Sequence, residues 1–450
     1  MTGPAQCPGA SGLLSSVVVG PTMSRQPENG PADRPGLPLP GSSHHIRHDG
    51  AVRWCISALA GLFLVSAVGL TAGAGALSAT PVFRTVAGLQ HPGILSSPSG
   101  IAVDAAGDLF VADTDHCRVM LVPDRTAATY GLHVKSGHAY TLAGSHCGAP
   151  QGLGFPTGVA VDRHGDVFIA EATNDRVVMV PPGGRAGPHA PVAVAGTGAP
   201  GYSGNGLPAT KSALNEPTGV AVDAAGDLFI ADTADCRVRM VPAHSGVHYG
   251  QPMMAGHLYN LVGTGICGSA LGYPALSSQI WNPVAVAVDQ SGDVYIAGNG
   301  DQTVVEVPVR SGDYYGTSIG AGDAQVIIGL VGDGNTPYLG DGLSATSIVS
   351  ELNDPEGLAV SPSGVLFVTD GTMHCIRVVP NVTGDIFGRV MNGGDMYTLA
   401  GALPVSNSLG IGDGTKWMLT RMGIPYGIAV TDSGGVVFSD EGTDQVRETG

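Results

Sequence analysis

The stretch EPTGVAVDAAGDLFIADTADCRVRMVPA, residues 216–243, decides the fold, because it contains three short strands in a pattern that recurs along the chain. GVAVD and DLFIAD are apolar runs rich in Val, Ile and Phe, and RVRMV alternates apolar with charged residues. DAAGD joins the first two runs, and Gly226 supplies the positive φ that a short hairpin loop needs. This stretch therefore predicts a three-stranded antiparallel unit.

The same 25-residue module occurs six times without a gap. Each copy begins with a proline, at Pro98, Pro156, Pro217, Pro283, Pro355 and Pro425. The second strand of five copies ends in an acid, at Asp113, Glu171, Asp232, Asp370 and Asp440, and the fourth copy has Gly298 there. A repeat of fixed period is the signature of a propeller or solenoid, in which each unit buries its apolar face against the next.

A fourth strand follows five of the modules, at residues 140–144, 192–196, 259–263, 326–332 and 397–401. The sixth module has none, but an orphan strand of the same type, RTVAG at 84–88, precedes the first module. We therefore predict an all-β, six-bladed β-propeller closed by this N-terminal strand, preceded by a disordered segment and one hydrophobic helix. Closure of this kind pairs strand edges that would otherwise be exposed.

The modules resemble NHL repeats, whose pattern runs Pro-x-Gly, Val-Ala-Val-Asp, Gly-Asn-Leu-Tyr, Ile-Ala-Asp and then Arg-Ile/Val. Residues 201–242 are similar to the bacterial and teneurin-like form, and the resemblance covers residues 84–450. Copy four departs from it with Ala285 and Gly298, and copies five and six replace the first Asp by Ser361 and Thr431. The nearest functional resemblance is to the sensor propeller of bacterial receptor serine/threonine kinases, here without a kinase.

The N-terminal part has a different composition. Residues 1–53 are rich in Pro, Gly and Ser without an apolar period, which indicates disorder. Residues 54–79 carry no charge and are long enough to span a bilayer, so they are expected to be a transmembrane anchor or a cleaved signal segment. Arg47 and Arg53 precede this segment and favour an orientation with the propeller, residues 80–450, outside the cell or secreted.

Charge and cysteine usage agree with an exported protein. The formal net charge of −17 disfavours nucleic acid, whose phosphates need Lys and Arg, and it leaves the N-terminal segment as the only expected membrane contact. Cys117 and Cys236 begin third strands, and Cys147 and Cys267 follow the antiparallel fourth strands. We predict disulfides Cys117–Cys147 and Cys236–Cys267, which persist only in an oxidising compartment, and a free buried thiol at Cys375. The alternative is that these are unrelated core cysteines.

The acids that end the second strands are the first candidate site. Asp113, Glu171, Asp232, Asp370 and Asp440 would form a ring around the axis, and converging carboxylates are the ligands that Ca²⁺ prefers. The alternative is structural: each acid caps the turn that follows it and pairs with Arg118, Arg176 or Arg237. The sequence predicts no other cofactor.

A second candidate site lies in long inserts between the third and fourth strands of copies one, three, four and five. Each insert carries an aromatic residue followed by Gly at the same register, namely Tyr130, Tyr249, Tyr315 and Phe387. A fixed length with a fixed aromatic predicts an ordered extension. The aromatics are either anchors for a partner on an exposed rim or plugs packed on their own blades.

These features favour a non-catalytic binding module that recognises a protein, a peptide or a cell-envelope glycan through one face. The alternative is an enzyme, a metal-dependent lyase or lactone hydrolase that uses the central channel, and a third possibility is a purely structural surface protein. No phosphate-binding loop, nucleophile elbow or HExxH motif occurs in the chain.

Overall fold

A computed structural model describes residues 83–87, 94–148, 152–183, 191–272, 274–329, 341–347, 352–401 and 422–449. The chain divides into two units, Met1–Ala74 and Gly75–Gly450, and every described residue belongs to the second unit. The predicted disordered segment, residues 1–53, and the predicted hydrophobic segment, residues 54–79, lie outside the described residues. Within the described ranges no helix has the length and apolar character needed to cross a membrane.

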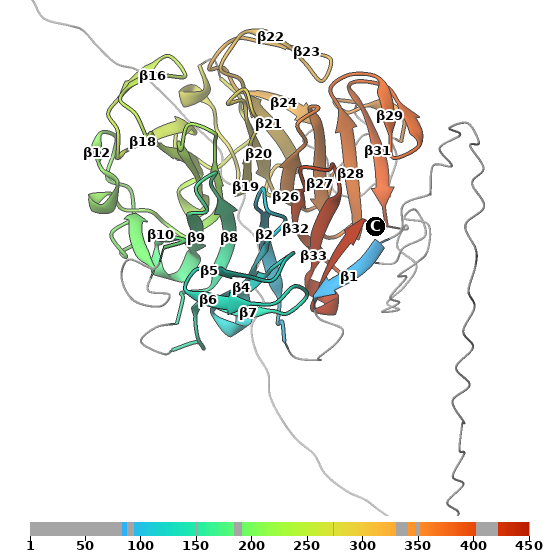
Figure 1. The fold of residues 1–450 in the computed structure, drawn as a ribbon. Helices are drawn as coiled ribbons and strands as arrows, with labels where there is room; N and C mark the ends of the chain where they lie inside the picture. Colours follow the sequence, from blue (N-terminus) through green and yellow to red (C-terminus); the bar gives the residue numbers. More distant parts are fainter. Residues whose placement is uncertain are drawn as a thin grey trace, which may run out of the picture. The chain divides into compact units, whose positions relative to one another are not determined.

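Four-stranded antiparallel sheets surround one axis as the blades of a propeller (Figure 1). From the axis outward, blade 1 consists of β2 (Pro98–Val103), β3 (Leu109–Asp113), β4 (Arg118–Val122) and β7 (Tyr140–Gly144). Blade 2 consists of β8 (Pro156–Val161), β9 (Val167–Glu171), β10 (Arg176–Val180) and β11 (Val192–Ala195). Blade 3 consists of β13 (Pro217–Val222), β14 (Leu228–Asp232), β15 (Arg237–Val241) and β18 (His257–Val262). A short strand, β12 (Leu207–Pro208), lengthens the outer edge of blade 3.

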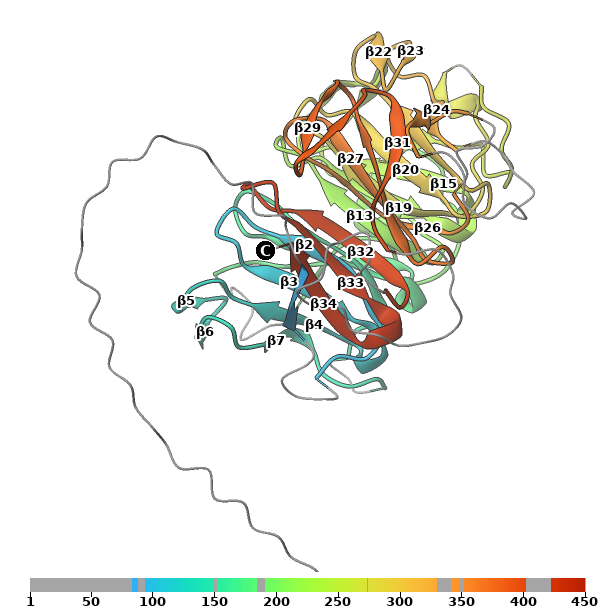
Figure 2. The ribbon, with the colours of Figure 1, turned by 90° about the vertical axis from the view of Figure 1, so that its right-hand side faces the viewer.

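The other three blades repeat this order. Blade 4 consists of β19 (Pro283–Val288), β20 (Val294–Gly298), β21 (Thr303–Val307) and β24 (Gln325–Ile328). Blade 5 consists of β26 (Pro355–Val360), β27 (Val365–Asp370), β28 (Cys375–Pro380) and β31 (Asp395–Ala400), with β25 (Leu343–Ser344) at its outer edge. Blade 6 consists of β32 (Pro425–Val430), β33 (Val436–Asp440), β34 (Gln445–Thr449) and β1 (Phe83–Ala87). The N-terminal strand β1 pairs with β34 and completes blade 6, which confirms the predicted closure (Figures 1 and 2).

The propeller has two faces, which we name by the ends of the inner strands. The entry face is where the inner strands begin, at the six module prolines, and the acids ending the second strands pair with these prolines, as Asp113 does with Pro98. The hairpin face is at the other end, where short loops such as 104–108 join the first two strands of each blade. The aromatic-bearing inserts also lie on the hairpin face, because they follow the third strands.

Those inserts form ordered two-stranded extensions, as predicted. The pairs are β5 (Ala127–Thr129) with β6 (Leu132–Val134), β16 (Gly246–His248) with β17 (Gln251–Met253), β22 (Gly312–Tyr314) with β23 (Thr317–Ile319), and β29 (Gly384–Ile386) with β30 (Arg389–Met391).

The hairpin loops are held by a polar side chain at their first residue. The carboxylate of Asp104 accepts hydrogen bonds from the backbone N–H groups of Ala106 and Asp108 at 2.8 and 2.9 Å. In blades 5 and 6 the hydroxyls of Ser361 and Thr431 accept the corresponding bond. The two sequence departures at this position therefore keep the turn, because a hydroxyl also closes such a loop.

Glycine at the third position of five modules lets the inner strands approach one another closely around the axis. A Cβ at Gly100 would lie 2.3 Å from the carbonyl oxygen of Thr157, and one at Gly427 would lie 2.4 Å from that of Ser99. The central channel is therefore narrow, with a cavity of about 60 Å³ between the inner strands. That volume holds a few water molecules and excludes a larger ligand.

We expect Gly100→Ala to lower the free energy of unfolding by about 1–3 kcal/mol, because the added methyl group meets backbone that belongs to the next blade and has little room to move. Urea denaturation of the variant beside the wild type measures this loss. The matched control is Gly384→Ala, where nothing lies within 4 Å of the added Cβ. Equal midpoints for the two variants would contradict the close approach of the inner strands.

Candidate functional site

The five acids at the strand ends are completely buried, and each is held by its own blade. Asp113 accepts the backbone N–H of Ser96 at 2.7 Å, Asp232 accepts that of Asn215 at 2.7 Å, and Asp440 accepts that of Gly423 at 2.9 Å. Glu171 and Asp370 accept the corresponding amides, from Gly154 and Asn353. The donor is in every case the residue two places before the module proline, so the acids fasten the loops that enter the blades.

The prediction that these acids cap the turns following them is wrong for Asp113, Glu171, Asp232 and Asp440, whose side chains make no cap hydrogen bond to those turns. Asp370 does accept the N–H of Met373 in its turn, at 3.1 Å. The reason is the strand pairing: the loop before the proline lies beside the acid, so its amides are nearer than those of the turn.

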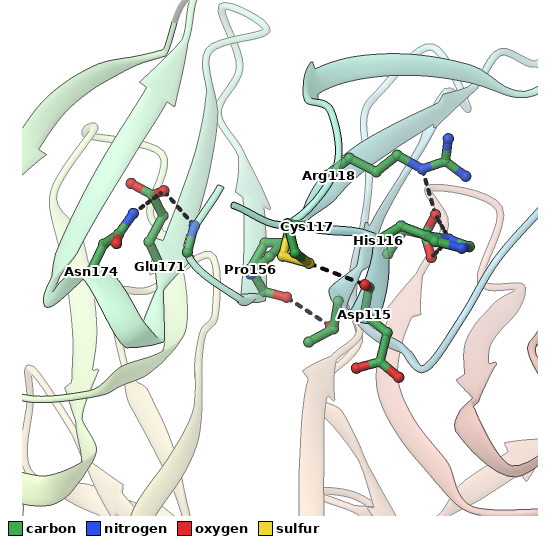
Figure 3. The surroundings of a disulfide bond; sticks show 11 residues. Asp115, His116, Cys117, Arg118, Pro156, Glu171 and Asn174 are labelled. Atoms are coloured by element: carbon green, nitrogen blue, oxygen red, sulfur yellow. Dashed lines mark hydrogen bonds and ion pairs between the residues drawn. A yellow bond between two sulfur atoms is a disulfide. The ribbon is translucent and has the colours of Figure 1, made fainter. Parts of the chain in front are cut away.

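Two of the predicted arginine partners are correct. Arg118 donates from Nε to Asp113 Oδ2 at 2.6 Å, with His116 on the same carboxylate (Figure 3). Arg176 donates to Glu171. In blade 3 the partner is the fully buried Arg239, with Nη1 3.3 Å from Asp232 Oδ2, and not Arg237. Arg237 instead donates to the carbonyls of Asp235 and Thr264, and both guanidinium groups lie over the ring of Tyr202, 3.9 Å (Arg237) and 4.9 Å (Arg239) from its centroid.

Blade 4, which lacks the acid, replaces it from the following turn. A Cβ at Gly298 would meet Oδ1 of Asp301 at 2.0 Å, so the Asp301 carboxylate fills the space of the missing side chain. Burial raises the pKa of Asp301 to about 6, and hydrogen bonds from Thr303 and from the backbone of Trp281 oppose the rise. Trp281 is the residue two places before the module proline, so Asp301 accepts the same backbone amide that the strand-end acid accepts in the other blades. This replacement was missed from the sequence alone, because Asp301 does not occupy the position at which the other modules carry the acid.

Within the described ranges no group of three or more His, Cys, Asp or Glu side chains is arranged to hold a metal ion. Calcium binding by the strand-end acids stays a prediction.

The predicted disulfides Cys117–Cys147 and Cys236–Cys267 are both present, with Cα–Cα distances of 5.0 and 5.2 Å. Each ties the start of a third strand to the segment after the fourth strand, at the entry face (Figure 3). Cys375 is a free, buried cysteine, as expected. It pairs with Asp370 in register, where blades 1 to 3 have an arginine, so it is displaced by one residue from the paired cysteines.

The aromatics of the extensions lie inside the molecule. Tyr130 and Tyr315 are 3% and 2% exposed, and Tyr249 and Phe387 are partly buried. Each ring meets an aromatic residue of its own blade edge to face, with centroids 5.7–6.2 Å apart. These rings therefore hold the extensions in place, and a partner on the hairpin face would meet other side chains.

Each of the three tyrosines also fastens its blade to the next. The hydroxyl of Tyr130 donates to the carbonyl of Gly165 in blade 2 at 2.8 Å. Tyr249 donates to Gly292 in blade 4, and Tyr315 donates to Gly364 in blade 5 at 3.2 Å. The acceptor is the same glycine of the hairpin loop in each blade.

The entry-face end of the central channel has two unlike halves. In blades 1 to 3 the second residue of the module is a hydroxyl residue, and these hydroxyls bond to the neighbouring blade. Ser99 donates to the carbonyl of Thr157 at 3.0 Å, Thr157 to that of Thr218 at 2.9 Å, and Thr218 to that of Val284 at 2.9 Å. In this half, each of the three hydroxyls therefore has a hydrogen-bond acceptor in the neighbouring blade.

In the other half the same module position carries Glu356 and Tyr426, and two further acids join them. We call Asn299, Asp354, Glu356, Tyr426 and Glu441 the channel-mouth cluster. The side-chain amide of Asn299 donates to the carboxylates of Asp354 and Glu356, in the latter case at 3.2 Å. None of the three acids forms an ion pair with any other described residue.

Burial and the neighbouring acids of the channel-mouth cluster oppose the ionisation of Glu356. Burial raises the pKa of Glu356 to about 8, the charges of Asp354 and Glu441 add to the rise, and a hydrogen bond with Tyr426 opposes it. Burial likewise raises the pKa of Glu441. A strongly perturbed acid in a channel mouth is a feature of functional sites. The sequence signal was present, because Glu356 and Tyr426 stand where the first three modules have Ser or Thr.

Exposed apolar side chains lie beside the cluster. Ile424 is 39% exposed and lies close to Asp354 and Glu356. Side-chain atoms of all three residues surround the position that a Cβ on Gly371 would occupy. Trp281, 51% exposed, packs over Gly300, next to Asn299. The cluster thus combines excess negative charge, hydrogen-bonding groups and apolar surface on a rigid frame.

The structure is thus that of a six-bladed β-propeller with a narrow central channel. Three of its modules, residues 95–119, 214–239 and 352–379, match the NHL repeat family model. The chain therefore carries NHL repeats on a six-bladed β-propeller. A search of curated proteins found no match.

Solved structures share the fold at low sequence identity. An auxiliary nutrient binding protein from Bacteroides thetaiotaomicron has a TM-score of 0.52 at 12% identity, over 79% of this chain and 69% of that one. A protein of the same description from Bacteroides ovatus has a TM-score of 0.52 at 13% identity, over 82% and 76%. A gluconolactonase from Xanthomonas campestris aligns over 84% and 93% at 14% identity, with a TM-score of only 0.47. These similarities establish the fold alone.

Proposed function

We propose that this protein is an exported, non-catalytic binding module whose recognition site is the channel-mouth cluster. The observation that carries the proposal is the group of three acids, Asp354, Glu356 and Glu441, which share the mouth with Tyr426 and have no cationic partner among the described residues. Carboxylates that lack a cation are a ready-made site for one, since charge-assisted hydrogen bonds are the strong ones.

The ligand group that fits is a guanidinium or ammonium group carried by a protein, a peptide or an amino sugar of the cell envelope. The channel beneath the cluster is too small for more than a side-chain tip or water, so the body of the ligand would lie across the entry face. There Ile424 and Trp281 offer apolar contact, and aromatic residues on a rigid surface make good anchors. The two auxiliary nutrient binding proteins of the same fold also support a binding role.

Two features support export. The disulfides Cys117–Cys147 and Cys236–Cys267 persist only where the environment is oxidising. The net charge of −17 is unsuited to nucleic acid. The propeller is proposed to lie at the cell surface, anchored or secreted.

The test is titration calorimetry with the capped tripeptide acetyl-Gly-Arg-Gly-amide, whose guanidinium stays charged at all working pH values. We expect saturable binding, reduced on the order of tenfold by Glu356→Gln and further by adding Asp354→Asn, since each substitution removes a charged hydrogen-bond acceptor. The matched control is Asp385→Asn, which removes one exposed charge from the hairpin face. Binding that is equal in all three proteins, or absent, would overturn the proposal.

The affinity for this peptide is expected to rise as the pH is raised from 6 to 9. The pKa of Glu356 is about 8 in the free protein, so at pH 6 its carboxyl is protonated and the cation must displace that proton. Above about pH 8 the carboxylate is already ionised and this cost disappears. The Glu356→Gln variant should lose most of this dependence, and a wild-type affinity that does not change with pH would contradict the role of Glu356.

A further inference from the structure

The contact between blades 6 and 1 lacks the extension aromatic that fills the corresponding contact after blades 1, 3, 4 and 5. Tyr130, Tyr249, Tyr315 and Phe387 each join the apolar cluster shared by their own blade and the next one. The cluster shared by blades 6 and 1, which includes Leu109 in its core, contains no aromatic residue among the described side chains. The cause is topological: β1 supplies the fourth strand of blade 6, so no extension joins β34 to it (Figure 2).

A second aromatic position in blade 6 is also vacant. The extension residues pack edge to face on Phe110, Phe229, Tyr295 and Phe367, all at the thirteenth position of their modules. Blade 6 has Val437 at this position. Among the described side chains, both rings of the pair are thus missing from the contact between blades 6 and 1.

A cavity of about 450 Å³ lies at this place, on the hairpin face. Val103, Leu109 and Val437 form apolar walls, and the polar part of the lining comes from Gly107, Asp124, Thr431, Ser433 and Glu448. The volume is in the usual range of small-ligand pockets. Because the lining comes from both blades and from β1, only the closed ring creates the cavity.

Gly107 is the glycine that, in blades 2, 4 and 5, accepts a tyrosine hydroxyl. Its counterparts are Gly165, Gly292 and Gly364. In the described part of the chain no donor reaches the carbonyl of Gly107. Beside its apolar walls and its polar side chains, the cavity therefore offers the backbone acceptor whose counterparts receive a tyrosine hydroxyl three times in the same molecule.

We propose that this cavity is a binding site for a phenol group, and that its occupant is a tyrosine side chain presented by a partner peptide. The ring enters between blades 6 and 1, and its hydroxyl donates to the carbonyl of Gly107. The site is on the face opposite the channel-mouth cluster, so the inference does not depend on the proposed function.

The experiment titrates the full-length protein with p-cresol, the side-chain analogue of tyrosine, and with 4-methylanisole, which has the ring but no hydroxyl donor. Saturation-transfer NMR and calorimetry report binding. We expect p-cresol to bind at least tenfold more tightly, because the methyl ether leaves the Gly107 carbonyl without a donor. A second pair of ligands, acetyl-Gly-Tyr-Gly-amide and acetyl-Gly-Phe-Gly-amide, distinguishes a peptide-borne tyrosine from a free phenol.

Val103→Trp tests the location, because the larger side chain fills the cavity, and we expect it to reduce p-cresol affinity at least tenfold. The control is Val247→Trp on the extension of blade 3, where Val247 is 74% exposed and far from the cavity in sequence and in blade. If Val103→Trp fails to fold, competition between p-cresol and the tyrosine peptide on the wild type replaces it, with competition expected. Absence of saturable p-cresol binding, equal binding of 4-methylanisole, or undiminished binding to a folded Val103→Trp protein would each overturn the proposal. A tyrosine peptide that binds no better than its phenylalanine counterpart would overturn the peptide assignment.

Discussion

Replacing the four paired cysteines with alanine should lower the free energy of unfolding by about 7 kcal/mol, the largest loss that we expect from any change considered for this chain. The disulfides join residues 30 and 31 positions apart. Closing a loop of that length in the unfolded chain is worth about 3–4 kcal/mol. The bonds lie in blades 1 and 3, which share no sheet, so their contributions should add.

Urea denaturation of the wild type, of each paired double variant and of the quadruple variant measures the two losses separately. Adding a reductant to the wild type should reproduce the quadruple variant, and it should leave the quadruple variant unchanged. Cys375→Ala serves as the control, because this buried cysteine has no disulfide partner. A midpoint that does not respond to reductant would show that the bonds contribute nothing to stability.

The second large effect concerns pH, and it arises at Glu306. This side chain is fully buried in β21, and neither carboxylate oxygen has a partner at hydrogen-bonding geometry among the described residues. Four of the other five modules have Leu121, Met179, Met240 or Val378 at this position, so an acid stands in an apolar site. Burial raises the pKa of Glu306 from 4.5 to about 9, the charges of Asp293 and Asp289 add to the rise, and the hydroxyl of Tyr295 opposes it.

The direction of the pH dependence follows from that shift. The folded protein keeps the Glu306 proton up to about pH 9, whereas the unfolded chain releases it near pH 4.5. The stability associated with this proton is therefore fully present below about pH 4.5 and is lost as the pH rises through about 9. Over that window this one group lowers the free energy of unfolding by up to about 1.4 kcal/mol per pH unit.

Glu306→Met, which copies the residue of blades 2 and 3, should flatten this dependence and raise the unfolding midpoint at pH 8. Thermal unfolding at pH 5, 7 and 9 measures both effects. Glu216→Gln is the control, because Glu216 is exposed and its removal should leave the slope unchanged. If the Glu306→Met protein retained the wild-type slope, the buried acid would not be its source.

The channel-mouth cluster and the cavity between blades 6 and 1 have a common origin in departures from the repeat. The cluster exists because Glu356, Tyr426 and Glu441 replace residues of the earlier modules. The cavity lies where the chain closes its ring with β1 and where blade 6 has no extension. In this repeat fold, the residues common to all modules stabilise the propeller. The two proposed binding sites lie where the chain departs from the repeat.

The six modules, their strands, the closure by the N-terminal strand and both disulfides could be predicted from the sequence. This was possible because these features depend on local periodicity and on the antiparallel register of neighbouring strands, as Cys117 beside Cys147 illustrates. The ordered extensions could be predicted for the same reason, because their fixed length is a local property of the chain. The burial of Tyr130 could not be predicted, because it depends on contacts made in the folded ring.

Only the tertiary structure decided where the side chains point and what they meet in another blade. The amide that holds Asp113 comes from the loop before its module, and Asp301 replaces an acid that is absent from its expected place. Glu356 acquires its raised pKa from burial and from Glu441 of the next blade. Burial and contacts between blades arise when the ring closes, and no local pattern in the sequence encodes the distance between two modules.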